Sequence, residues 1–212
     1  MLMDRSQIGL MSKRFNSKTL ILAVFLCLWV SGAKAAESPQ AVVQNGSEQV
    51  LKILNQYPQD TPARREQIRG VIDGYFDFEA IARLTMGLRW KSVPSEKQQE
   101  FTLEFKKLLF NTYLRDIEKY AKQKITYNSR SINSGYVVVK GVVWDQGGPV
   151  SLDYSLHLKD GNWTVYDVAV EGMSLVSNYR RQFDSVLANG SFDDLFRMLR
   201  QKTAQICASH NC

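Results

Sequence analysis

The second half of the chain contains four short segments whose apolar and polar residues follow the spacing of β-strands. They cover residues 125–127, 136–144, 150–158 and 163–170. In the third segment Leu152, Tyr154 and Leu156 fall on one side, and small or polar residues fall on the other. The turn signals between the segments are short, as in Asp160-Gly161-Asn162. The pattern therefore predicts a four-stranded antiparallel sheet with one covered face.

Before and after these strands, apolar residues recur at the three- and four-residue spacing of amphipathic helices. The predicted helices cover residues 39–57, 62–74, 78–90, 95–117, 174–189 and 191–199, and Asp77 and Ser174 are predicted as the N-caps of the third and fifth. The joint between the last strand and the next helix, Trp163 to Phe183, is expected to define the core and any cavity inside it. We therefore predict an α+β fold, in which several helices cover the four-stranded sheet and an apolar pocket lies between sheet and helices.

The first 35 residues have the features of a secretory signal peptide. Four basic residues precede an apolar run from Leu20 to Val30, and the A-x-A cleavage site Ala33-Lys34-Ala35 follows it. Cleavage after Ala35 leaves 177 residues, enough for one domain. We assign residues 36–201 to that domain and residues 202–212 to a C-terminal tail. Met11 is an alternative start to Met1.

Composition narrows the classes of partner and chemistry. Most of the formal charge of +6 lies in the first 35 residues, so the exported domain is nearly neutral and a nucleic-acid partner is not indicated. His157 is expected on the polar face of a strand, and His210 with Cys207 and Cys212 lacks the spacing of a zinc site. We therefore predict no catalytic residue, no metal and no cofactor. Export permits a Cys207–Cys212 disulfide, and two unpaired thiols are the alternative.

One long motif carries a resemblance to a known family. The stretch from Trp163 to Phe183, WTVYDVAVEGMSLVSNYRRQF, closely resembles the signature of the MlaC family, and Phe76-Asp77-Phe78 through Trp90 resembles a second family segment. The helix bearing Gln99-Glu100-Phe101 resembles a third. The resemblance covers nearly all of residues 36–201, whereas the cysteine-bearing tail departs from it.

This resemblance implies a function and a location. MlaC proteins are soluble periplasmic carriers that hold glycerophospholipid by its acyl tails in an apolar pocket, with the headgroup exposed. They pass the lipid between an outer-membrane lipoprotein–porin complex and an inner-membrane ABC transporter with an MCE-domain subunit, which maintains the lipid asymmetry of the outer membrane. The chain is accordingly expected to be a periplasmic monomer with phospholipid as its ligand.

We predict the walls of the pocket from the placement of residues along the expected elements rather than from the family motif. The candidate lipid-binding residues are apolar or aromatic, and they come from the long helix, the sheet and the strand–helix joint. They are Phe105, Leu109, Tyr113, Val139, Leu152, Tyr154, Leu156, Met173 and Leu175. The alternative for each of them is ordinary packing in the core.

Two other functions are compatible with the pattern. An enzyme acting on envelope molecules would need a nucleophile and a base, for which Ser155 or Ser174 with His157 are the candidates. An adaptor would use its apolar surface to bind another protein and would have a solid core. A carrier differs from both because it needs apolar walls and no reactive groups.

Overall fold

The computed structural model describes residues 37–121, 123–145 and 147–210. The chain divides into two units, residues 1–35 and 36–212, and the second is described here. The predicted signal peptide and its cleavage after Ala35 therefore lie outside the described residues, as do Cys212 and the two candidate start residues. Among the described residues, no helix combines the length and apolar character that crossing a bilayer requires.

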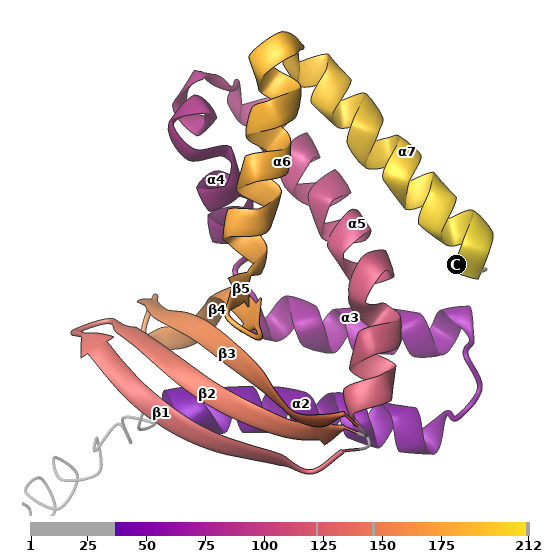
Figure 1. Ribbon diagram of the computed structural model, residues 1–212, viewed down its shortest axis with the longest axis vertical. Helices are drawn as coiled ribbons and strands as arrows, with labels where there is room; N and C mark the ends of the chain where they lie inside the picture. The colour runs from indigo at the N-terminus through magenta and orange to yellow at the C-terminus, as the bar shows by residue number, and fades with distance from the viewer. Residues whose placement is uncertain (1–36, 122, 146, 211–212) are drawn as a thin grey trace, which may run out of the picture. The chain divides into compact units, whose positions relative to one another are not determined.

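The described residues form an α+β fold, as predicted (Figure 1). The elements, in chain order, are α2 (Pro39–Gln56), α3 (Pro62–Tyr75), α4 (Phe78–Met86), the 3₁₀ helix η1 (Gly87–Ser92), α5 (Ser95–Ala121), β1 (Ile125–Asn133), β2 (Tyr136–Asp145), β3 (Gly148–Lys159), β4 (Asn162–Val170), β5 (Met173–Ser174), α6 (Leu175–Asn189) and α7 (Phe192–His210).

The sheet has five strands rather than the four predicted, and their order is β1-β2-β3-β4-β5 with every pair antiparallel. The fifth strand contains only two residues. Glu171 and Gly172 adopt positive φ angles of 50° and 77°, and this tight turn brings Met173 back to pair with Val170. A two-residue strand is too short to produce a hydrophobic period, which explains why sequence reasoning did not find it.

The helix α7 continues beyond the point where the predicted domain ends. It extends to His210, so residues 202–210 are helical. Ile206 in this last part packs against a buried apolar cluster formed by the helices. The domain boundary at residue 201 stays a prediction. Cys207 in this helix is disulfide-bonded, which excludes the unpaired-thiol alternative for that residue.

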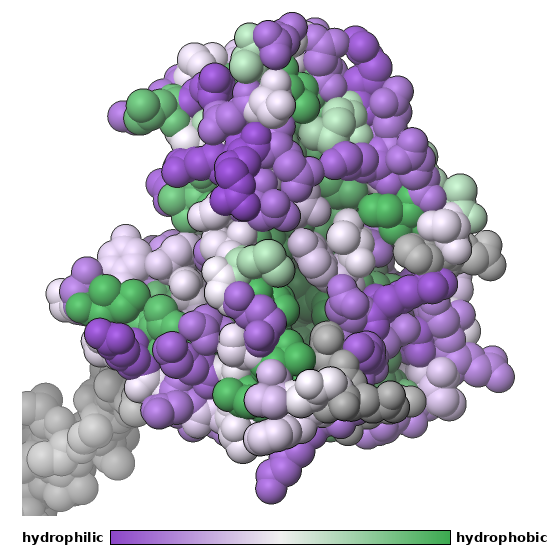
Figure 2. Space-filling model, viewed as in Figure 1, coloured by the Kyte–Doolittle hydropathy of each residue, from purple (hydrophilic) through white to green (hydrophobic). Residues whose placement is uncertain are grey.

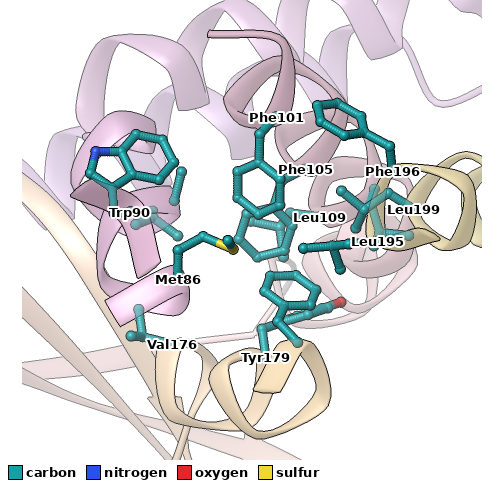
Figure 3. Packing of buried hydrophobic residues seen from close by; sticks show 14 residues of the cluster. Met86, Trp90, Phe101, Phe105, Leu109, Val176, Tyr179, Leu195, Phe196 and Leu199 are labelled. Carbon is teal, nitrogen blue, oxygen red and sulfur yellow. The ribbon is translucent and has the colours of Figure 1, made fainter. Parts of the chain in front are cut away.

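The buried apolar residues fall into three separate clusters. The helical cluster is built by α4, η1, α5, α6 and α7, and its aromatic rings interlock as Figure 3 shows, with Phe105 and Tyr179 centroids 4.9 Å apart. The sheet cluster joins one face of β2, β3 and β4 to Val42 and Val43 of α2. The third cluster joins α2, α3 and the C-terminal half of α5 around the fully buried Ile68.

Candidate functional site

One face of the sheet provides an uncharged, apolar surface. The strand register places Val139 of β2 opposite Tyr154 of β3, and Tyr154 opposite Val168 of β4. Because side chains alternate along a strand, Leu152, Tyr154 and Leu156 share this face, as the sequence predicts. We call it the inner face, since α2 packs against it. Polar residues such as Asp153 and His157 occupy the opposite, outer face.

The helices provide a second apolar surface. Phe105 and Leu109 of α5 are buried in the helical cluster, where Figure 3 shows them pointing towards α6 and α7. Tyr113, one turn further along α5, is only partly buried and lies against the margin of the cluster. Leu175, the first residue of α6, is placed in the same way.

The two surfaces face a recess between the sheet and the helices. Figure 2 shows apolar side chains in this recess, between the lower end of α6 and the strands. A domain of this size usually has one contiguous core, whereas here the sheet cluster and the helical cluster are distinct sets of buried residues, with the partly buried Phe76 packed against both. We call the recess between the inner face of the sheet and the apolar surface of the helices the cleft.

The nine predicted lipid-binding residues occupy different positions relative to the cleft. Val139, Tyr154 and Leu156 belong to the sheet cluster, and Phe105, Leu109, Tyr113 and Leu175 belong to the helical cluster or pack against it. Leu152 is buried on the inner face but belongs to none of the three clusters. Met173, in the tight turn before α6, is 73% exposed.

Burial separates these residues into two kinds. Val139 and Leu156 are 0% exposed and Phe105 is 1% exposed, so their side chains are already surrounded by protein. Tyr113, Tyr154 and Leu175 are half-buried although they come from the interior of the fold. The assignment of all nine to lipid binding stays a prediction.

Tyrosine hydroxyls are the polar groups near these surfaces. Burial raises the pKa of Tyr154 and of Tyr127, and the Tyr127 hydroxyl donates a hydrogen bond of 3.0 Å to Ser47 Oγ. Burial also raises the pKa of Tyr113 and of Tyr179. All four therefore stay neutral at physiological pH, and the surroundings of the cleft are polar at a few points without being charged.

Asp167 fixes the joint between β4 and α6 at the edge of the cleft. A bulge displaces the register of β4 near this residue, and its carboxylate accepts the Val176 N–H at 3.0 Å and the Ser174 hydroxyl at 2.5 Å. Ser174 in turn accepts the Ser177 N–H at 3.0 Å, so the predicted N-cap is confirmed. Sequence reasoning missed the role of Asp167, and the available signal was an acidic residue inside an apolar strand.

A second carboxylate fixes α4 to the sheet. Asp77 accepts the Ala80 N–H at the start of α4, and it contacts His157 Nε2 at 3.1 Å and Lys159 Nζ at 2.9 Å on β3. Its own N–H donates to the Val165 carbonyl of β4. Burial alone would raise the pKa of Asp77, but the hydrogen bonds from Ala80 and Lys159 outweigh it and hold this pKa below its usual value.

The candidate catalytic residues of the enzyme alternative have structural partners. His157 contacts Asp77, and Ser174 caps α6. Ser155 lies on the outer face of β3, opposite Asp167 of β4. Within the described part of the chain, no group of three or more His, Cys, Asp or Glu side chains is arranged to hold a metal ion.

Two surface pockets lie away from the cleft. One, of about 530 Å³, lies between η1, the start of α5 and the α6–α7 connection, and Val93 and Phe192 contribute to its lining. The other, of about 380 Å³, lies on the outer face beside Ile132 and Val138. Neither is lined by any of the nine predicted lipid-binding residues.

Comparison with known proteins identifies relatives of this chain. The model of a family described as "MlaC protein" matches residues 44–201. The intermembrane phospholipid transport system binding protein MlaC of Haemophilus influenzae is 22% identical over 92% of this chain and 95% of that relative. The toluene tolerance protein ttg2D of Pseudomonas putida is 28% identical over 81% of this chain and 82% of that relative.

A solved structure shares the fold. It is the phospholipid-binding protein of Ralstonia solanacearum in complex with a phospholipid. Its similarity covers 81% of this chain and 99% of that one, with a TM-score of 0.74 and 28% sequence identity.

Proposed function

This chain belongs to the MlaC family, and from that membership we propose that it is a soluble carrier that binds glycerophospholipid by its acyl tails. The observation that carries the proposal is the pairing of an uncharged inner sheet face with an apolar helical surface across the cleft. A site for acyl chains needs apolar walls and few polar groups, and these two surfaces provide them. The phospholipid bound to the structural relative from Ralstonia supports the same ligand class.

The energetics of acyl chains explain why such a carrier is needed. Burying one methylene group contributes about 0.8 kcal/mol, so exposing two chains of ~16 carbons to water costs roughly 25 kcal/mol. Free passage of a phospholipid through water is therefore negligible. A carrier whose cleft resembles the membrane interior makes transfer nearly balanced, and the carrier itself then needs no catalytic residue, metal or other cofactor. The exposed headgroup need not be recognised, so headgroup selectivity should be low.

We further propose where the carrier works and with what. The signal-peptide pattern of residues 1–35 supports export to the periplasm. The family resemblance supports exchange with an outer-membrane lipoprotein–porin complex and an inner-membrane ABC transporter with an MCE-domain subunit, in maintenance of outer-membrane lipid asymmetry. On this proposal the protein works as a monomer, and nucleic acid is not a partner.

The proposal is tested by placing a charge in the cleft. Leu152 is buried on the inner face but outside all three clusters, so Leu152→Arg is expected to fold and to lower the amount of bound lipid several-fold. The long Arg side chain can direct its charge into the cleft, where acyl chains would otherwise lie. The measurement is lipid transfer between donor and acceptor vesicles, together with circular dichroism to verify folding.

Two variants serve as controls for this test. Val142→Arg places the same charge on the outer face of the neighbouring strand and should leave transfer unchanged. Leu156→Arg introduces the charge at a fully buried position and is expected to unfold the protein, because an unpaired buried charge is costly. If Leu152→Arg folds and carries as much lipid as the parent protein, the inner face is not the lipid site.

A further inference from the structure

One hydroxyl on the inner face has no hydrogen-bond partner. On the same face the Tyr127 hydroxyl donates a hydrogen bond to Ser47 Oγ. Among the described residues, the Tyr154 hydroxyl has no such partner, although burial is strong enough to raise its pKa. A ligand that covers this surface would withdraw the hydroxyl from water, and a hydroxyl withdrawn without a replacement partner is costly.

The Tyr154 hydroxyl is also not sealed inside the protein. Among the described residues, the sealed side-chain atoms without a partner are Arg64 Nε and Thr164 Oγ1, and the Tyr154 hydroxyl is not one of them. Tyr154 is half-buried, whereas its register partner Val139 is 0% exposed. The hydroxyl is therefore not fully enclosed by protein, and the strand register places its side chain on the inner face of the sheet.

The Tyr154 hydroxyl can donate and accept a hydrogen bond, and its donor is the function that an acyl lipid can use, because an ester group carries acceptors and no donor. Tyr127, which lies close enough to raise the pKa of Tyr154, already donates its proton to Ser47 Oγ, and Ser47 donates to the Val43 carbonyl at 2.9 Å. The proton of Tyr154 is not used in this way. A ligand that completes the site must consequently bring an acceptor.

The acceptor must be uncharged. The inner face around Tyr154 consists of Val139, Leu156 and Val168, and the nearest polar groups are neutral hydroxyls. A phosphate placed here would lose its hydration without gaining an opposite charge, which is strongly unfavourable. In a glycerophospholipid the neutral acceptors with good geometry are the carbonyl oxygens of the two fatty-acyl esters.

We propose that Tyr154 is a specificity-determining residue whose hydroxyl donates a hydrogen bond to an acyl-ester carbonyl of the bound lipid. This inference rests on the proposed carrier function and deepens it, because it makes the cleft selective for ester-linked over ether-linked lipids. Ether lipids of equal chain length bury the same apolar surface but lack the carbonyl, so they leave Tyr154 without its acceptor. One hydrogen bond of this kind corresponds to a preference of about 3- to 10-fold.

The test is a competition between two lipids that differ only in this linkage. The purified protein is stripped of lipid and incubated with vesicles containing equal amounts of diester and diether phosphatidylcholine with matched chains. Bound lipid is then extracted and quantified by mass spectrometry. The parent protein should hold the diester lipid in about 3- to 10-fold excess. Tyr154→Phe should hold a similar total amount with a ratio near one, and Tyr166→Phe, which removes a hydroxyl on the outer face, should keep the parent ratio.

The outcomes separate this inference from the carrier function. A ratio near one in the parent protein overturns the role of Tyr154 while lipid binding stands, and this result does not depend on the folding of any variant. A folded Tyr154→Phe that keeps the parent preference overturns it equally. If the parent protein takes up neither lipid, the carrier proposal itself fails, and the inference fails with it.

Discussion

At the scale of single residues, two carboxylates connect the helices to the sheet. Asp77 holds the start of α4 against β3 and β4, and Asp167 holds the start of α6 against β4. The sequence predicted Asp77 as the N-cap of α4, and this is confirmed by the 3.0 Å hydrogen bond from Ala80. It did not predict the contacts with His157 and Lys159, because these contacts between the start of α4 and β3 join segments about 80 residues apart in the sequence.

The Asp77 contacts predict a stability that depends on pH. The folded-state pKa of Asp77 lies below its unfolded value of about 3.9, so its ionised form contributes stability at and above that pH, and the contribution disappears as pH falls through the folded-state pKa. Asp77→Asn should lower the free energy of unfolding at pH 7 by about 1–3 kcal/mol. Urea denaturation at pH 7, 5, 4 and 3 measures this difference.

The difference between the parent protein and Asp77→Asn should shrink as the pH falls below about 4, because Asp77 of the unfolded parent chain then takes up a proton, and it should disappear once the folded carboxylate is protonated as well. Asp73→Asn is a suitable control, since Asp73 is exposed and pairs with Lys106 at the surface. A constant difference across this pH range would show that Asp77 acts by shape and packing and not by its charge.

At the scale of elements, hydrophobic periodicity predicted those segments in which one side is covered. Residues 150–158 alternate because the inner face packs on α2, and they lie within β3. β1 extends to Asn133, well beyond the predicted end at residue 127, because it is an edge strand whose second half is exposed. Asn128, Ser129 and Arg130 carry no burial pattern, so only pairing with β2 defines them as a strand.

The joint between β4 and α6 is expected to contribute to the free energy of unfolding. Asp167→Ala removes the acceptor of the Val176 N–H and of the Ser174 hydroxyl, which leaves both without a partner at the start of α6. The expected loss in the free energy of unfolding is about 1–3 kcal/mol, measured by urea denaturation. Asp116→Ala, at an exposed position of α5, should change it by less than about 0.5 kcal/mol. Equal effects of the two substitutions would show that the joint does not depend on Asp167.

At the scale of the whole described unit, the sequence predicts that a cleft exists more readily than it predicts which residues line it. Val139, Leu156 and Tyr154 have the same alternation and the same face, yet the first two are fully enclosed and the third is half-buried. The difference depends on how closely the helices approach each point of the sheet, which no local pattern encodes. Met173 shows the same limit, because its exposure follows from the tight turn at Glu171 and Gly172.

As a carrier, the protein is proposed to hold a diacyl phospholipid between its sheet and helices. The most direct test is native mass spectrometry of the mature protein purified from the periplasm, followed by solvent extraction and lipid analysis. If the protein is such a carrier, its mass should exceed that of the bare mature chain by the mass of a diacyl phospholipid, and the extracted lipid should have mixed headgroups. A mass equal to that of the bare chain, unchanged after incubation with liposomes, would contradict it.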